Sequence, residues 1–311
     1  MDVILGVDGG NSKTELVAAT IEGELIAFVR GRGSNSHGVG AEGAAEVIDD
    51  LVREARVGST ATHGAFYLCG ADVPEDIAEL EAAVARRAWV REAVVDNDTF
   101  ALLRAGTAAE SAVAVVCGSG INCVGRGPGG RVARYPSLGW ETGDWGGSEM
   151  LANEALFLAA RDEDGRGTPT ALVELVRAHF ELSVTEVGEA VHYRRMPAAR
   201  LGELAPGVVA LAAEDAVARS LVERLANEIA LLVERAFRDL AVDAADVVLG
   251  GGMLQAGEGF LHDAVLVRLP AGARPVVLRD PPVLGAALAA LDAAGASDTA
   301  KERLRDELRR R

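Results

Sequence analysis

The chain has 311 residues, 49% of them hydrophobic, which is enough for two domains that each bury a core. It carries 47 acidic against 31 basic residues, a formal net charge of −16, and such a surface repels nucleic acid phosphates and anionic lipid headgroups. Nucleic acid and membrane partners are therefore not expected. The N-terminus lacks a signal-peptide pattern and no apolar run approaches 18 residues, so we expect a cytoplasmic protein.

The first third of the chain is predicted to fold as β-β-β-α-β-α-β-α. Short apolar runs separated by tight turns predict three antiparallel strands at residues 3–7, 15–20 and 25–29. Strands and helices alternate after that point. They are expected at residues 41–55 (helix), 65–69 (strand), 75–87 (helix), 93–95 (strand) and from residue 98 onward (helix).

The second part of the chain begins with the same pattern. Strands at residues 111–116 and 121–125, and a third after Pro128-Gly129-Gly130, repeat the opening hairpin and suggest a duplicated domain. Beyond them we expect helices at 148–160, 170–181 and 215–237, strands at 246–249 and 276–278, and a helix at 283–293 that returns to the first domain. The charged tail, residues 301–311, is predicted to be a solvated helix or a frayed end.

These elements predict an α/β fold with two domains. The first covers residues 1–107 and is joined by the helix at about 284–294, and the second covers residues 108–283 with helical insertions. Cys69, Cys117 and Cys123 are an odd number without metal-site spacing, so reduced thiols are expected.

The first glycine turn is the run Asp8-Gly9-Gly10-Asn11-Ser12-Lys13-Thr14. Paired glycines let backbone amides approach an anion, and the hydroxyls and Lys13 add donors, so this turn predicts a phosphate site. Asp8, directly before the turn, suits a Mg²⁺ ion that bridges phosphates. The run could also be an ordinary hairpin turn with a lone aspartate.

Two further glycine turns follow apolar strands. Cys117-Gly118-Ser119-Gly120 occupies the equivalent place in the second half, and it predicts a second phosphate contact. Gly250-Gly251-Gly252-Met253 ends a strand, where glycines let a flat ligand such as a nucleoside lie on the backbone. Taken alone, each could be a simple chain reversal.

Together the three turns, in this order, resemble the two phosphate motifs and the adenosine motif of the actin, hexokinase and Hsp70 superfamily. Within it the chain resembles the BadF/BadG/BcrA/BcrD ATPases, and among these the N-acetylglucosamine kinases, up to residues 281–286. The resemblance implies two ribonuclease H-like domains, an ATP cleft between them, a Mg²⁺ ion and a homodimer. It also implies transfer of phosphate from ATP to the 6-hydroxyl of an amino sugar, N-acetylglucosamine or glucosamine.

The resemblance also implies roles for single residues. Asn97-Asp98 matches the strand end that supplies the catalytic base, and a carboxylate is needed to accept the hydroxyl proton. Asp98 is therefore the expected base and also contacts the sugar, whereas Asp96 is expected to be a solvent or capping residue. Asp98 could instead only cap the helix that follows.

Further sugar contacts are expected from Asn35, Ser119, Asn122 and Asp144. Asp144 lies in Gly139-Trp140-Glu141-Thr142-Gly143-Asp144-Trp145-Gly146-Gly147-Ser148, which is similar to the family's Gly-Asp-Glu-Gly-Ser loop. The sequence departs from that loop after Asp144, where a tryptophan replaces the glutamate and an additional glycine precedes Ser148. The indole of Trp145 could cover the apolar face of a sugar, or the loop could be a helix N-terminus capped by Ser148 with the tryptophans in the core. His37, beside Asn35, is expected to be incidental.

Two other function classes remain open. An ATPase that activates an iron-sulfur enzyme shares the fold, but it needs cysteines at a subunit interface, and Cys117 and Cys123 are expected to pack in the core. A sensor without catalysis is disfavoured because Asp8, Asp98 and Asp144 are all present.

Overall fold

The computed structural model describes residues 2–58, 60–255 and 257–311. It divides into two compact units, the first formed by the chain up to Ala114 together with Leu278–Arg311, and the second by Val115–Val277. Each unit is described by itself. The domain limits expected from the sequence, at 107/108 and 283/284, stay a prediction.

The first unit is built on a five-stranded mixed sheet in the order β3-β2-β1-β4-β5. Its strands are β1 (Val3–Gly9), β2 (Lys13–Thr20), β3 (Leu25–Arg32), β4 (Ala61–Leu68) and β5 (Val90–Asn97). The first three pair antiparallel, whereas β1, β4 and β5 run parallel, with Gly9 opposite Leu68 and Leu68 opposite Asn97. The carboxyl ends of these three parallel strands therefore lie at one edge of the sheet, where ligands of open α/β sheets bind.

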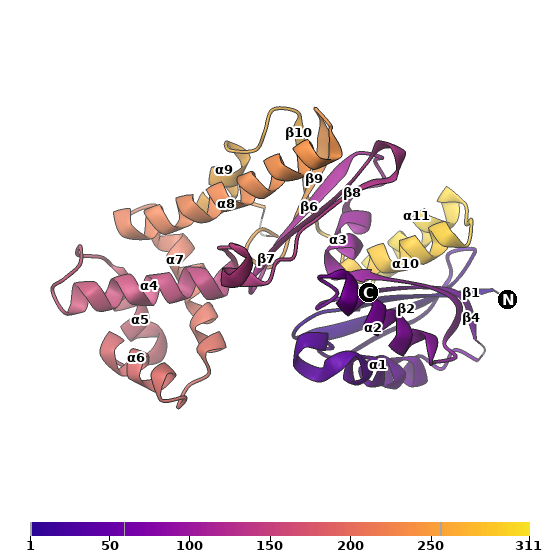
Figure 1. Ribbon diagram of the computed structural model, residues 1–311, viewed down its shortest axis with the longest axis horizontal. Helices are drawn as coiled ribbons and strands as arrows, with labels where there is room; N and C mark the ends of the chain where they lie inside the picture. Colours follow the sequence, from indigo (N-terminus) through magenta and orange to yellow (C-terminus); the bar gives the residue numbers. More distant parts are fainter. Residues whose placement is uncertain (1, 59, 256) are drawn as a thin grey trace. The chain divides into compact units, whose positions relative to one another are not determined.

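Helices cover both faces of this sheet (Figure 1). The helices are α1 (Ser36–Ala55), α2 (Pro74–Ala85), α3 (Asp98–Gly106), α10 (Pro282–Ala293) and α11 (Asp298–Arg309). Alternate residues of β1 enter two cores, because Leu5 packs with α1 and α2 while Ile4 packs with α10 and α11. At Gly6 a Cβ atom would lie 2.3 Å from the backbone nitrogen of Ala287, so only glycine lets α10 cross β1 this closely.

The C-terminal tail is a helix, one of the two expected alternatives, but one side of it is buried. It forms α11, whose Leu304 and Leu308 are buried in the core beside α10. Asp280, which is buried, forms ion pairs with Arg305 and with Arg309, the latter at 2.6 Å. The charge density of the tail suggested a solvated segment, but its apolar residues recur at helical spacing and supply one buried stripe.

The second unit repeats the arrangement. Its strands are β6 (Ala112–Cys117), β7 (Ile121–Gly127), β8 (Arg131–Arg134), β9 (Ala245–Gly250) and β10 (Ala273–Val277). They form a sheet in the order β10-β9-β6-β7-β8, so β6 takes the place that β1 has in the first unit. Two mixed five-stranded sheets of the same order confirm the predicted α/β fold class with a duplicated hairpin.

The helices of the second unit extend from this sheet (Figure 1). They are α4 (Gly147–Glu163), α5 (Leu172–Phe180), α6 (Val184–His192), α7 (Ala205–Leu211), α8 (Ala216–Leu240) and α9 (Phe260–Leu266), with short 3₁₀ turns η1 (Pro128–Gly130), η2 (Gly139–Thr142) and η3 (Ala198–Leu204). The sequence predicted α4, α5 and α8, but neither α6 nor α7. Both missed helices have fewer than ten residues, too few for a periodic pattern to stand out.

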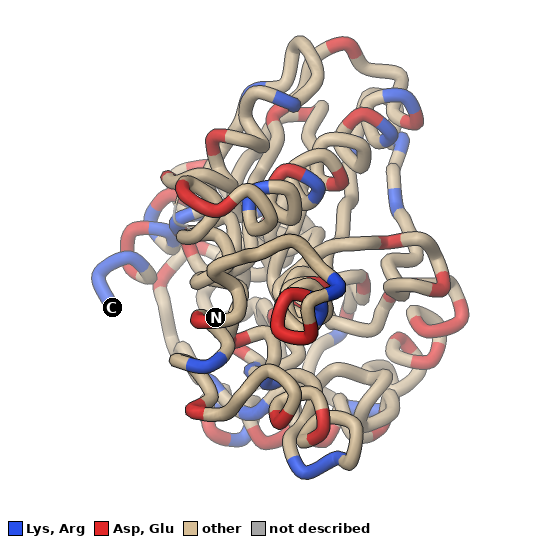
Figure 2. The backbone as a smooth tube through the Cα atoms, turned by 90° about the vertical axis from the view of Figure 1, so that its left-hand side faces the viewer, with Lys and Arg blue, Asp and Glu red and all other residues tan. Residues whose placement is uncertain are grey.

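The charged residues are spread over both units. In Figure 2 acidic positions recur along helices and loops, interleaved with arginines. Within the described residues, none of the helices combines the length and apolar character that crossing a membrane requires.

Candidate active site

The first glycine turn joins β1 to β2 and is formed as the sequence predicted. The backbone N–H of Gly10 donates to the carbonyl of Lys13 at 2.9 Å, and Asn11 and Ser12 are exposed at the tip. A Cβ atom at Gly9 would lie 2.5 Å from Ser34 Oγ and 2.6 Å from Leu68 Cδ2, so the turn can pack here only because residue 9 is glycine.

The side chains of Lys13 and Thr14 are engaged by the protein. Thr14 is buried and its hydroxyl donates to Ser34 Oγ at 2.8 Å, which ties the turn to the loop after β3. Lys13 Nζ lies 2.9 Å from a carboxylate oxygen of Glu15, which is fully buried and also pairs with Arg30. Because the Gly10 amide is bonded to Lys13, the exposed residues Asn11 and Ser12 are, of the predicted donors, best placed to meet an anion.

Asp98 begins α3 at the end of β5. The cap of this helix is Asn97, whose Oδ1 accepts from the backbone N–H of Thr99 at 2.9 Å, so the capping role that the sequence left open for Asp98 falls to its neighbour. Asn97 Nδ2 also donates to Asp72 Oδ1 at 2.7 Å. The Asn97 side chain therefore fixes the start of α3 and holds a second carboxylate near it.

Three carboxylates meet at this edge of the sheet. Burial, and the Asp72 carboxylate in second place, raise the pKa of Asp98 to about 7, although the Thr99 amide opposes them. Burial also raises the pKa of Asp8 well above its usual value of 3.8, helped by the charges of Asp98 and Glu15 and opposed by Lys13. The pKa of the Cys69 thiol is raised by burial and by the charges of Asp98, Asp72 and Asp8, which places this thiol among the three acids.

Sequence reasoning missed Asp72. It follows β4 by four residues, in Gly70-Ala71-Asp72-Val73-Pro74, and its signal is its position after a strand that runs parallel to the strands carrying Asp8 and Asn97. Because parallel strands end at one edge, an acid just after any of them is a candidate for the same site. For this part of the chain the sequence predicted only a strand at 65–69 and a helix from residue 75.

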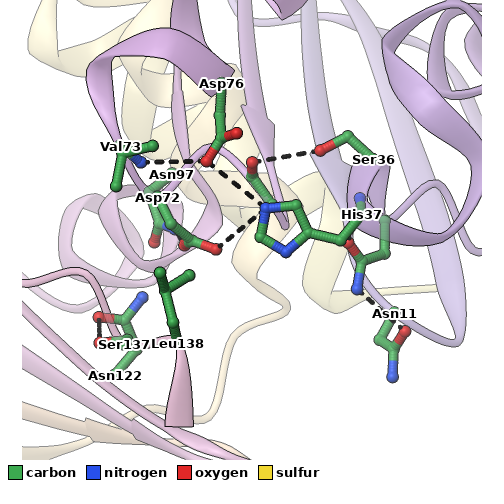
Figure 3. A network of polar contacts seen from close by, with 12 residues as sticks. Asn11, Ser36, His37, Asp72, Val73, Asp76, Asn97, Asn122, Ser137 and Leu138 are labelled. Carbon is green, nitrogen blue, oxygen red and sulfur yellow. Dashed lines mark hydrogen bonds and ion pairs between the residues drawn. The ribbon is translucent and has the colours of Figure 1, made fainter. Parts of the chain in front are cut away.

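Asn35 and His37 lie at the start of α1. Asn35 caps this helix by accepting from the N–H of His37 at 3.0 Å, and its Nδ2 donates to Asn11 Oδ1 at 3.3 Å, which brings the expected sugar-binding residue to the first glycine turn. His37 Nε2 lies 3.4 Å from Asp76 Oδ2 and 3.9 Å from Asp72 Oδ2 (Figure 3). In the described part of the chain this trio is the one group of His, Cys, Asp or Glu gathered closely enough to hold a metal.

The second glycine turn, residues 118–120, joins β6 to β7 in the second unit. Gly118 N donates to Gly120 O at 2.9 Å. The start of α4 is hydrogen-bonded to the turn, because Ser148 N donates to Gly118 O at 2.7 Å. Ser119 and Gly120 are exposed, and a Cβ on Gly118 would meet no atom within 4 Å. The turn therefore offers an open backbone surface that is anchored by α4.

The third glycine turn packs against the second. Gly251 has φ +84°, and a Cβ there would lie 2.4 Å from the carbonyl oxygen of Cys117, the residue before the second turn. Met253 N donates to that same oxygen at 3.0 Å. Gly252 is open, with no atom within 4 Å of a Cβ position. The structure thus brings together the two turns that the sequence assigned to phosphate and to adenosine.

Asp144 and Asn122 occupy separate positions in the same unit. The Asp144 carboxylate accepts a hydrogen bond from the Thr142 hydroxyl, and the Asp144 N–H donates to Gly139 O at 2.9 Å. Asn122 Oδ1 accepts from Ser137 Oγ at 2.7 Å (Figure 3). These bonds fix the side chain of Asp144 within its loop and that of Asn122 at the start of β7.

The two tryptophans near Asp144 behave differently from each other. Trp145 is buried, and the guanidinium of Arg224 lies 4.0 Å from its ring centroid, so one face of this indole is already covered. Trp140 is 77% exposed. The N-cap of α4 is Gly146 rather than Ser148, so the interpretation of this loop as a serine-capped helix with both tryptophans in the core is wrong.

The model of the BadF/BadG/BcrA/BcrD ATPase family matches residues 5–290, which include all three glycine turns, Asp98 and Asp144. The chain belongs to this family. The resemblance inferred from the turns is therefore confirmed over nearly the whole chain. As a member of this ATPase family the protein is expected to use ATP.

Two relatives of this ATPase have assigned activities. An N-acetylmuramic acid/N-acetylglucosamine kinase of Clostridium acetobutylicum is 26% identical over 275 residues, which cover 85% of this chain and 89% of the relative. An N-acetyl-D-glucosamine kinase of Dictyostelium discoideum is 24% identical over 328 aligned positions, which cover 94% of this chain and 98% of the relative.

Solved structures share the fold of this ATPase. A Chromobacterium violaceum protein proposed to be an N-acetylglucosamine kinase matches with a TM-score of 0.71 at 20% identity, over 93% of this chain and 98% of that one. A Streptomyces griseus glucokinase of the ROK family, solved with glucose and AMPPNP, matches with a TM-score of 0.61 at 16% identity, over 93% and 99%.

Proposed function

We propose that this ATPase transfers the γ-phosphoryl group of ATP to the 6-hydroxyl of an amino sugar, with N-acetylglucosamine as the first candidate and glucosamine as the second. The names of the two curated relatives support a sugar acceptor. The chain's own residues support the chemistry.

Asp98 carries the proposal. A general base works best when its pKa lies near the operating pH, and burial together with Asp72 brings the pKa of Asp98 to about 7. Asp98 accepts the proton of the 6-hydroxyl as that oxygen bonds to the γ-phosphorus and the bond from the γ-phosphorus to the β-γ bridging oxygen breaks. ADP leaves with the bond electrons, and the proton on Asp98 passes to solvent after the sugar phosphate departs.

Mg²⁺ fits the acids around this base. Hard divalent cations prefer oxygen ligands, and burial with the charges of Asp98 and Glu15 raises the pKa of Asp8, so a cation beside this carboxylate would stabilise its charged form. Asp8 would hold the ion through water. When bound, the ion neutralises charge on the phosphates of ATP.

The glycine turns and the polar side chains complete the proposed roles. Gly9 and Gly10 shape the first turn, whose exposed residues Asn11 and Ser12 bind phosphate, as does the open turn of residues 118–120, and the third turn supports the nucleoside. Lys13 acts mainly through Glu15, and Thr14 through Ser34, because those contacts occupy them. Asn35, Asn122, Ser119 and Asp144 position the sugar, and exclusion of water from the acceptor limits ATP hydrolysis. A homodimer and a cytoplasmic location stay predictions from the sequence.

The second function class is an ATPase that activates an iron-sulfur enzyme. It needs thiolates at an accessible surface, whereas Cys117 and Cys123 are fully buried and their thiol pKa values are raised by that burial. Purified protein that is brown and rich in iron, with ATP hydrolysis independent of any sugar, would support this class against the kinase.

The kinase proposal is tested by ADP release with ATP, Mg²⁺ and a panel of acceptors: N-acetylglucosamine, glucosamine, N-acetylmannosamine, glucose and N-acetylmuramic acid. The expected result is sugar-dependent ADP release that is greatest with N-acetylglucosamine, with phosphate on its 6-oxygen by ³¹P–¹H NMR correlation. ADP release that no sugar stimulates would overturn the proposal.

A further inference from the structure

A pocket of about 350 Å³ lies on the second unit beside the loop that carries Asp144. It is lined by Trp140, Trp145, Met150, Asn153, Glu154 and Phe157. These residues come from η2, from the residue after Asp144 and from one side of α4, and we call the site the tryptophan pocket. Trp140 and Phe157 are 77% and 56% exposed, which is unusual for large aromatic side chains that have no ligand to cover.

The walls of the tryptophan pocket combine aromatic faces with two polar groups. Flat aromatic side chains cover the apolar C–H face of a sugar ring, while an amide and a carboxylate can bind its hydroxyls, so this lining suits a carbohydrate. Arg224 holds the inner wall in place, because its guanidinium stacks on Trp145 and lies 3.4 Å from Glu154 Oε2. Trp140 supplies the outer wall.

The charge of the lining selects among carbohydrates. The one charged residue of the wall is Glu154, and the nearby Arg224 is already paired with it. Because Arg224 compensates this carboxylate, the lining residues present no unpaired charge to hold an ionic group, which favours a neutral ring. None of the six lining residues belongs to the acceptor-binding set proposed above, so the pocket remains for a part of the substrate beyond the acceptor ring.

We propose that the tryptophan pocket is a saccharide subsite that binds a second, neutral pyranose ring glycosidically linked to the acceptor amino sugar. The proposal rests on the kinase function for the identity of the acceptor. It extends that function, because it makes the enzyme more selective for a disaccharide than its acceptor residues alone would. A volume of about 350 Å³ lies near the lower end of the range for small-molecule sites and suits one ring.

Tryptophan fluorescence can test the subsite directly, because the chain has three tryptophans and two of them line the pocket. The third, Trp89, is buried in the first unit with its Nε1 bonded to Asp49 at 2.8 Å. Trp89→Phe therefore leaves only the pocket indoles to report. In this background, without ATP, the β-1,4-linked dimer of N-acetylglucosamine should shift the emission to the blue and reduce acrylamide quenching at least twofold.

The same titration with Phe157→Ala added keeps both reporting indoles and should lose the response to the dimer. Tyr193→Ala is the matched control, since Tyr193 is a 65% exposed aromatic of the same unit outside the pocket, and it should leave the response unchanged. A response that survives Phe157→Ala, or its absence at millimolar dimer, overturns the subsite. Tighter binding of N-acetylmuramic acid than of the dimer would overturn the proposal that the subsite prefers a neutral ring.

Kinetics separate failure of the subsite from failure of the kinase proposal. Trp140→Ala should raise the KM of the dimer about tenfold and leave the KM of N-acetylglucosamine within twofold. Phosphorylation of both acceptors with equal sensitivity to Trp140→Ala removes the subsite and keeps the kinase. If neither acceptor is phosphorylated, the kinase proposal fails and the fluorescence titration alone decides whether the pocket binds saccharide. Sedimentation in which Trp140→Ala turns a dimer into a monomer would overturn the subsite in favour of an interface between two copies.

Discussion

Replacing Asp98 with asparagine should make the protein more stable while removing its activity. The substitution keeps the shape of the side chain and removes a carboxylate whose pKa is raised from 3.8 to about 7 by burial and by Asp72. A carboxyl with a raised pKa in the folded state adds stability at low pH, where it is protonated. That stability is lost as the pH rises from about 4 through about 7.

The size of the effect follows from the shift. About three pKa units at about 1.4 kcal/mol each give about 4 kcal/mol as an upper limit for the penalty of the ionised side chain in the folded state. Solvent screening lowers the value, so we expect about 2–4 kcal/mol at pH 8. For units of this size that corresponds to an increase in Tm of several degrees.

Thermal unfolding between pH 4 and pH 8 measures this difference. The gain in Tm of Asp98→Asn over the wild type should be near zero at pH 4, grow as the pH rises and level off above pH 7. Asp96→Asn is the matched control, because it removes the same charge two residues earlier in β5 and keeps an amide oxygen that can accept from the Asn97 N–H, as Asp96 Oδ1 does. A gain that is equal at all pH values, or a loss of stability at pH 8, would show that the carboxyl of Asp98 is not held in this environment.

Three further substitutions test other parts of the account. Gly251→Ala should destabilise the protein by about 1–2 kcal/mol in denaturant unfolding, because it places a Cβ at positive φ against the backbone of Cys117. It should also raise the KM for ATP in steady-state kinetics. Asp280→Ala should cost about 1–3 kcal/mol in denaturant unfolding, since it leaves two C-terminal arginines without their buried partner, and an unchanged midpoint would contradict that role for α11. Asp8→Asn should lower turnover at least tenfold and raise the Mg²⁺ concentration for half-maximal rate, whereas unchanged Mg²⁺ dependence would place the ion elsewhere.

The fold could be predicted well where local patterns are strong. Glycine turns between short apolar runs identified both hairpins, and the match between them predicted that β6 would take the place of β1. The helix that was one alternative for residues 301–311 is confirmed, but the sequence did not reveal its buried side. The burial of Leu304 and Leu308 depends on α10, a partner that lies nearby only after folding.

The candidate site could be predicted in part. Asp8 and Asp98 were found because each adjoins a motif, yet no local pattern marks Asp72, whose relation to Asn97 arises only when β4 and β5 pair. Composition does not reveal which polar and aromatic side chains are buried. Thr14 is buried, and Lys13 pairs with Glu15. Trp145 is buried against Arg224, whereas Trp140 is exposed to solvent.

The central claim is that Asp98 serves as the base in phosphoryl transfer to a sugar hydroxyl. It is tested most directly by single-turnover transfer from ATP to N-acetylglucosamine at pH 7.5 with the wild type, Asp98→Asn and Asp96→Asn. The account predicts that Asp98→Asn lowers the transfer rate by about 10²–10⁴-fold with ATP affinity within a few-fold of the wild type, while Asp96→Asn stays within a few-fold in both. A transfer rate for Asp98→Asn within tenfold of the wild type would contradict it.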